Sequence, residues 1–158
     1  MENLAQALKE LGEKNGFEIE LDESGSCTLE LADGRPILLQ ERTNLNELDF
    51  GAILGEVPED VRADVFESLL TANFYWKETL GATLSWNVDI QQVVLIYPLP
   101  LADATATTLE SVFTHFLELQ AAWKDRLAGL VANAQKGEDE EEEEEAPPAA
   151  NDNMIITP

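Results

Sequence analysis

Apolar residues recur at intervals of three and four in three stretches of the chain, the spacing of amphipathic helices. The first stretch is short and covers residues 4–11, before two glycines. The second starts at Pro58, a residue tolerated in the first turn of a helix, and its wide apolar stripe continues to Phe74. The third is rich in aromatic residues and covers residues 107–134. The pattern therefore predicts three helices.

Alternation of apolar and polar residues predicts strands between these helices. Three alternating runs, 17–21, 27–31 and 37–41, are separated by turn sequences and indicate a meander. Two further runs follow the second helix. The first, 82–88, alternates, whereas 93–97 is apolar on both faces, which is typical of a central or doubly covered strand.

Residues 44–57 carry apolar residues and two glycines without a clear period. We interpret this region as an irregular connection with room for a short strand. The resulting fold class is α+β, with a mainly antiparallel five-stranded sheet and three helices in the order α-β-β-β-α-β-β-α.

The end of the chain differs in composition from the rest. Eight consecutive acidic residues occupy positions 138–145, and so many like charges in a row are typical of a disordered segment. We therefore expect one folded domain over residues 1–136 and an acidic, disordered tail over residues 137–158.

The net charge of the chain is −23, and the part before the tail still carries 23 acidic and 9 basic residues. Nucleic acid and anionic lipid would be repelled, whereas a basic or apolar protein partner would be favoured. A single cysteine allows no intrachain disulfide and fits a reducing cytoplasm. The sequence has neither a signal peptide nor an apolar run long enough to cross a membrane, so we expect a cytoplasmic protein without membrane insertion.

Residues suited to catalysis or metal binding are scarce. His115 is the only histidine, and no nucleophile and second titratable group stand at a triad spacing from it. Cys27 shares a strand face with leucines and is best explained as a small buried side chain. The acidic residues are best explained as a solvent-exposed surface. No glycine-rich phosphate loop occurs in the sequence. We expect no catalytic residues, no metal, no cofactor and no enzyme activity.

The predicted elements carry more apolar surface than three helices and one sheet can bury. A second copy of the chain or a bound segment of another protein would cover the excess. The alternative is that residues 44–57 cover it within one copy.

Three motifs and the closing helix give the chain a family resemblance. They are Leu69-Leu70-x-Ala72-Asn73, then Gly81-Ala82-Thr83-Leu84-Ser85, then Val94-Leu95-Ile96-Tyr97-Pro98-Leu99-Pro100-Leu101, followed by Phe113, Phe116 and Trp123. In this order, over residues 4–130, the chain resembles the class I type III secretion chaperones, to which the CesT-type (Tir) chaperones belong. The resemblance implies a bacterial cytoplasmic homodimer without enzymatic activity. Such a dimer binds an extended N-terminal segment of one or more secreted effectors, keeps it secretion-competent and helps deliver it to the secretion apparatus.

The resemblance also implies where these contacts lie, element by element. The middle helix and the strands after it tend to form the dimer contact, and the first helix and the meander tend to hold the effector. The dimer set maps to Val65, Phe66, Leu69, Leu70, Phe74 and Leu95. The effector set maps to Leu4, Leu8, Leu11, Ile19, Leu29 and Leu38.

The acidic tail departs from the family pattern. Our hypothesis is that it docks on a basic component of the secretion apparatus, and the alternative is a solubilising segment. Two other functions stay open. One is an acidic binding module or inhibitor that blocks a basic protein partner, with binding lost in salt. The other is an enzyme, which would show turnover sensitive to His115→Ala.

Overall fold

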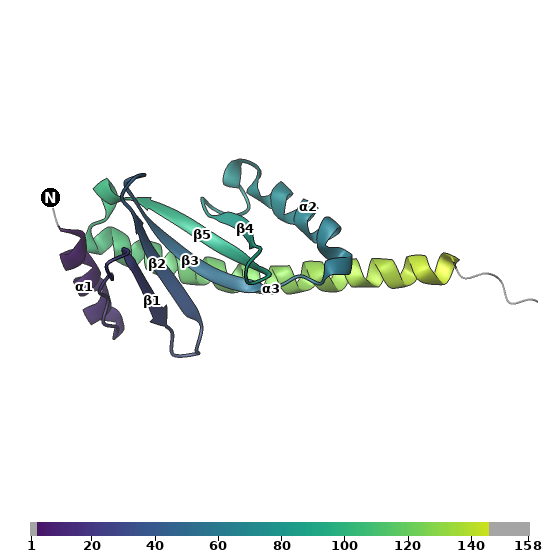
Figure 1. Ribbon diagram of the computed structural model, residues 1–158, viewed down its shortest axis with the longest axis horizontal. Helices are drawn as coiled ribbons and strands as arrows, with labels where there is room; N and C mark the ends of the chain where they lie inside the picture. Colours follow the sequence, from purple (N-terminus) through teal and green to yellow (C-terminus); the bar gives the residue numbers. More distant parts are fainter. Residues whose placement is uncertain (1–2, 146–158) are drawn as a thin grey trace, which may run out of the picture.

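The computed structural model describes the backbone of residues 3–145 and the side chains of residues 3–137. Five antiparallel strands form one sheet in the order β1-β2-β3-β5-β4 (Figure 1). The predicted fold class and its order of elements are confirmed. The bounds are α1 Leu4–Asn15, β1 Ser26–Glu30, β2 Pro36–Arg42, β3 Glu47–Glu56, α2 Arg62–Asn73, β4 Thr83–Asn87, β5 Gln92–Pro100 and α3 Ala106–Glu145, with short 3-10 turns at Glu59–Val61, Phe74–Trp76 and Leu101–Asp103.

The third strand of the meander differs from the prediction. β3 lies in the region expected to be irregular, and it pairs with β2 on one side and β5 on the other. Gly51 and Gly55 interrupt the alternation of apolar and polar residues by which the other strands were predicted. Gly51 stands opposite Leu38, and a Cβ at this glycine would lie 3.5 Å from the Leu38 side chain. A β-bulge between Ile53 and Gly55 then shifts the period by one residue.

Residues 17–21, predicted as the first strand, belong to no strand. Asp22, just after this segment, is joined to the start of β1, because its N–H donates to the carbonyl of Ser26 at 2.9 Å. Beyond that bond the segment follows α1 rather than β1. The ring of Phe17 packs edge-on against Phe113 of α3 at 6.2 Å, and this contact lies away from the sheet edge.

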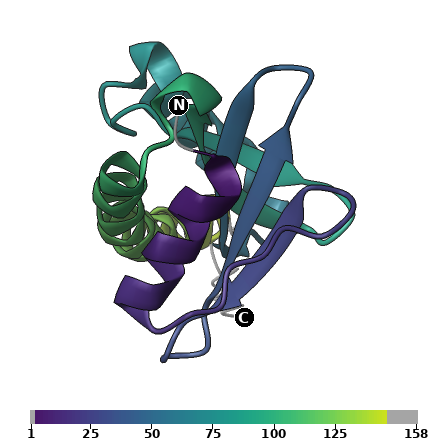
Figure 2. The ribbon, with the colours of Figure 1, turned by 90° about the vertical axis from the view of Figure 1, so that its left-hand side faces the viewer.

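None of the three helices covers the second face of the sheet (Figure 2). α1 and α3 lie together against the other face (Figure 2). The buried side chains of the sheet point toward them, and Phe50 of β3 meets Phe116 of α3 at a ring distance of 5.9 Å. On the uncovered face, Leu38 and Ile53 remain 42% and 39% exposed. β5 is therefore internal to the sheet, but within residues 3–145 helices cover only one of its two faces.

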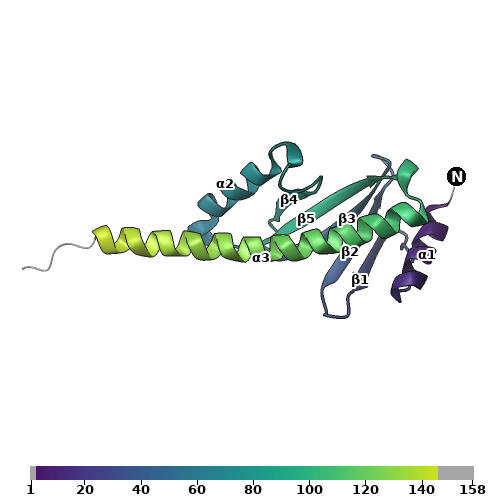
Figure 3. The ribbon, with the colours of Figure 1, turned by 180° about the vertical axis from the view of Figure 1, so that it is seen from behind.

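α3 extends further than the predicted domain boundary at residue 136. It continues through the acidic run to Glu145, and its last turns pass beyond the rest of the fold (Figure 3). The backbone is therefore helical over the first part of the predicted tail, and the division into a folded domain over residues 1–136 and a disordered tail stays a prediction. Adding residues to a formed helix is far easier than starting one, and glutamate is a good helix former. Residues 146–158 of the predicted tail lie outside the described residues.

A close approach of two backbones brings residues 17–19 against α1. The helix continues through Gly12 and ends at Gly16, whose φ of 77° is left-handed. A Cβ added at Gly12 would lie 2.6 Å from the carbonyl oxygen of Phe17 and 3.1 Å from Cγ1 of Ile19. Gly12 is thus required by its neighbours rather than by its own backbone conformation.

We predict that Gly12→Ala destabilises the protein by about 1–3 kcal/mol, because backbone atoms must move to admit the methyl group. Gly129→Ala in α3 is the control, since a Cβ there meets nothing within 4 Å. It should leave stability unchanged or raise it by up to about 1 kcal/mol. Urea unfolding at one fixed protein concentration measures both, and equal effects would contradict the close approach.

Candidate functional site

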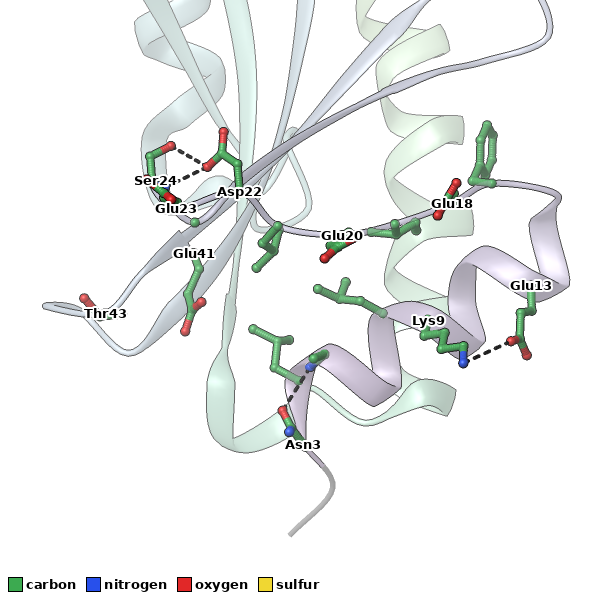
Figure 4. Close-up of a pocket in the computed structure, with 17 residues that line it drawn as sticks. Asn3, Lys9, Glu13, Glu18, Glu20, Asp22, Glu23, Ser24, Glu41 and Thr43 are labelled. Carbon is green, nitrogen blue, oxygen red and sulfur yellow. Dashed lines mark hydrogen bonds and ion pairs between the residues drawn. The ribbon is translucent and has the colours of Figure 1, made fainter.

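Two surfaces stand out, and the larger is a hollow of about 940 Å³ beside the first helix. We call it the α1 groove. One wall is the outer side of α1. The other is formed by the extended segment 17–21 and the turn 22–25 that follows it, and the end of β2 closes the groove (Figure 4). Its lining residues are Asn3, Leu4, Ala5, Leu8, Lys9, Glu13, Phe17, Glu18, Ile19, Glu20, Leu21, Asp22, Glu23, Ser24, Gly25, Glu41 and Thr43.

The floor of the α1 groove is apolar. Leu8 and Ile19 belong to the buried core, and Leu4, Phe17 and Leu21 are half-buried against it. These side chains come from α1 and from alternate positions of the extended segment. The groove therefore offers an apolar floor that is partly open at Leu4, Phe17 and Leu21 among the described residues.

The rim of the α1 groove is acidic. It carries six carboxylates and one amine, and the amine of Lys9 lies 4.0 Å from Glu13 on the same helix. The carboxylates are those of Glu13, Glu18, Glu20, Asp22, Glu23 and Glu41. Such a rim favours a positively charged occupant over a negative one.

The extended segment has unpaired backbone groups. Among the residues that the structure describes, no hydrogen bond joins the backbone N–H or C=O groups of Glu18, Ile19, Glu20 or Leu21 to another group. Their side chains alternate: those of Glu18 and Glu20 are exposed, and Ile19 is buried. This stretch has the shape of a strand without the ladder of a strand.

Asp22 fixes the turn that ends the extended segment. Its Oδ1 accepts hydrogen bonds from the Ser24 hydroxyl at 2.7 Å and from the backbone N–H groups of Ser24 and Ser26 at 2.8 and 3.0 Å. These bonds, that from the hydroxyl first, lower the pKa of the Asp22 carboxyl below its ordinary value.

The second surface lies on α2 and its C-terminal turn, and we call it the α2 outer face. Phe66, Leu70 and Phe74 follow one another at helical spacing, together with Ala63, Glu67 and Thr71. Leu70 is 70% exposed and Phe74 is 69% exposed. Phe66 is half-buried, because its ring packs against Trp86 of β4 at 5.1 Å.

The turn after α2 continues this apolar surface. Tyr75, Trp76 and Leu80 are all exposed, and the ring of Tyr75 meets Phe74 edge-on at 4.6 Å. All three have positive φ values of 51–52°, a conformation that bulky residues seldom adopt. Strained backbone that displays large apolar side chains is more typical of a binding surface than of a simple connection.

The structure divides the predicted dimer residues into two groups. Phe66, Leu70 and Phe74 lie together on the α2 outer face. Val65 and Leu69 face the opposite way into the core, and Leu95 is buried under the helices. Sequence reasoning missed Tyr75, Trp76 and Leu80, because a wide apolar stripe does not show which of its sides is covered.

The predicted effector residues are also divided. Leu4, Leu8 and Ile19 line the α1 groove, Leu11 and Leu29 are buried in the core, and Leu38 is exposed on the uncovered sheet face. The acidic rim was not predicted as part of this site. The signal was present in the glutamates that alternate with Phe17, Ile19 and Leu21.

Residues suited to catalysis do not gather in either surface. His115 is half-buried, with its ring edge-on to Tyr97 at 6.1 Å, and Cys27 packs against the core. Over residues 3–137, no group of three or more His, Cys, Asp or Glu side chains is placed to hold a metal ion. Within the described chain, no helix combines the length and the apolar character that crossing a membrane requires.

Comparison with known families gives one match. The sequence model of the Tir chaperone protein (CesT) family matches residues 6–124 of this chain. No curated protein matches the sequence.

Solved structures share the fold. A chain of the ExsC–ExsE complex aligns with a TM-score of 0.67 at 21% identity, over 78% of this chain and 92% of that one. A chain from the structure of the Yersinia pestis type III secretion chaperone SycH with a stable fragment of YscM2 aligns with a TM-score of 0.60 at 19% identity. The alignment covers 76% of this chain and 98% of that one. A chain of the HopA1–SchA chaperone–effector complex aligns with a TM-score of 0.60 at 14% identity, over 76% of this chain and 91% of that one.

The lowered pKa of Asp22 leads to a prediction about pH. A carboxyl whose pKa is lower in the folded state stabilises the fold above its unfolded pKa, and this contribution is lost as pH falls through the folded value. Asp22→Ala should therefore be less stable than the parent at pH 7, and the difference in unfolding free energy should shrink below about pH 4.

Asp22→Asn, which keeps the oxygen acceptor without the charge, is the matched control. Its loss of unfolding free energy at pH 7, relative to the parent, should be smaller than that of Asp22→Ala. Urea unfolding of the three proteins at pH 7 and pH 3 measures these differences. A deficit for Asp22→Ala that stays constant with pH would contradict a role for the charge.

Proposed function

The chain belongs to the Tir chaperone protein (CesT) family, and we propose on that basis that it acts as a type III secretion chaperone. It binds an extended N-terminal segment of one or more secreted effectors, keeps that segment secretion-competent and helps deliver it to the secretion apparatus. The observation that carries the proposal is the pair of separate apolar surfaces, the α1 groove and the α2 outer face, that the described residues of a single copy leave open.

We assign the α2 outer face to a second copy. It is formed by one helix and its following turn, and a two-fold axis beside α2 would bring Leu70 and Phe74 against their own counterparts. The buried Val65, Leu69 and Leu95 then support this face from behind, while Phe66, Leu70 and Phe74 make the contact. Tyr75 and Trp76 extend the contact at its edge.

We assign the α1 groove to the effector. A groove with an apolar floor suits a chain segment whose side chains enter it one after another. Ordering a flexible segment opposes binding, so a large buried area is needed, and a hollow of about 940 Å³ provides room for several side chains. The ExsC–ExsE and HopA1–SchA structures are complexes of related folds, and this agrees with a binding role.

The alternative of an acidic inhibitor is less well supported. Charge alone would carry the affinity of such a module, whereas both surfaces in this chain are built on exposed or half-buried apolar side chains. We further propose that the chain has no catalytic turnover, uses no cofactor and works in the bacterial cytoplasm. The docking of residues 137–158 on the secretion apparatus stays a prediction.

The dimer assignment predicts that Leu70→Asp gives monomers, because an unpaired carboxylate would be buried in the contact between the two copies. Leu45→Asp is the matched control, since Leu45 is also exposed but lies in the turn between β2 and β3. Light scattering during size exclusion should show the parent and Leu45→Asp as dimers. A Leu70→Asp dimer with a normal circular dichroism spectrum would contradict the assignment.

The chaperone function is tested in a bacterium with an active type III apparatus. Deleting the gene for the chain should lower secretion of at least one effector, and the tagged chain should capture that effector through its N-terminal segment. Limited proteolysis of the complex maps the protected segment. Unchanged secretion of every effector after the deletion would contradict the proposed function.

A further inference from the structure

The α1 groove carries enough detail to specify the chemistry of its occupant, given the chaperone function proposed above. We propose that it selects an extended segment in which apolar residues alternate with lysine or arginine, and that this segment binds as a strand along Glu18–Leu21. Three features of the groove lead to this conclusion: unpaired backbone groups, an apolar floor and an acidic rim.

The first feature is the unpaired backbone of residues 18–21. The chain holds this stretch extended, because Gly12 lets it lie against α1 and the Asp22 turn anchors its far end. Its N–H and C=O groups have no partner among the described residues, and its four residues line the α1 groove. A second strand placed in the groove would form hydrogen bonds with these groups, and the stretch would keep its extended conformation.

The second feature sets the alternation. Successive side chains of a strand point to opposite faces, and residues paired across two strands share a face. Ile19 is buried and Leu21 half-buried, so residues of the bound strand on their side would reach the floor near Leu4 and Leu8. Every second residue of the occupant is therefore apolar.

The third feature sets the charge of the remaining positions. Glu18 and Glu20 are exposed and occupy the other face of the extended segment, so they would stand beside the intervening residues of the bound strand. Glu13 is at one end of the groove, and Glu23 and Glu41 are at the other (Figure 4). Lysine or arginine at these positions meets a carboxylate at each step, whereas aspartate or glutamate would be repelled.

The probes are synthetic peptides of nine residues with a fluorescent label, and fluorescence anisotropy measures their binding to the full-length chain. The basic peptide has valine, leucine or isoleucine at odd positions and lysine or arginine at even positions. A second peptide has glutamine at the even positions. A third has the composition of the basic peptide in scrambled order, and a fourth carries N-methyl groups on alternate backbone nitrogens.

The basic peptide should bind about tenfold more tightly than the glutamine peptide in low salt, and the scrambled and N-methylated peptides should bind more weakly than the basic one. Amide hydrogen exchange at residues 18–21 should slow when the basic peptide binds, because these N–H groups enter a ladder. Slowed exchange is a readout that a purely electrostatic contact would not give.

Glu18→Gln with Glu20→Gln should lower the affinity for the basic peptide about tenfold and leave that for the glutamine peptide unchanged. The matched control is Glu59→Gln with Asp60→Asn, which removes two exposed carboxylates from the turn before α2. This control should bind the basic peptide nearly as the parent does. Equal losses in the two double variants would mean that net charge alone attracts the peptide, and this would overturn the proposal.

The proposal also fails if the basic, glutamine and scrambled peptides bind alike, or if exchange at residues 18–21 does not change on binding. These outcomes leave the chaperone function standing when the captured effector still binds the chain. Conversely, if deletion of the gene changes no secretion while the peptide results hold, the chaperone function fails and the recognition chemistry of the groove stands.

Discussion

The packing of two helices against only one face of the sheet is the constraint on which the rest of the molecule depends. Phe50 and Phe116 mark the centre of this contact, and both are completely buried. Because α1 and α3 share that face, the core is completed on one side of the sheet alone. α2 then packs at the β4 edge with one side inward, and its other side stays exposed among the residues that the structure describes.

This arrangement leaves two surfaces whose composition suits the binding of proteins, and residues suited to catalysis gather in neither of them within the described part of the chain. The α1 groove combines an apolar floor with a rim of carboxylates, and the α2 outer face is apolar around Leu70 and Phe74. Both are too open to exclude water from a reacting group, but both can bury area against a polypeptide. The chain belongs to the Tir chaperone protein (CesT) family. In the proposed function, the α2 outer face binds the second copy and the α1 groove binds the effector.

The strand count was predicted correctly although one strand was misplaced. Residues 17–21 have the alternation of a strand, yet Gly12 and the contact between Phe17 and Phe113 draw them toward the helices. β3 lacks an unbroken alternation, yet pairing on both sides with β2 and β5 makes it the centre of the sheet. In both cases contacts between distant residues outweighed the local pattern.

The sequence by itself determined the three helices, four of the five strands, the acidic charge and the scarcity of catalytic residues, because each of these depends on local spacing or composition. Only the tertiary structure decided which apolar side chains are covered. Leu69 and Leu70 are neighbours in one helix, and one is buried while the other is 70% exposed. Periodicity reveals that a face is apolar, but whether another element lies against it depends on segments far away in the chain.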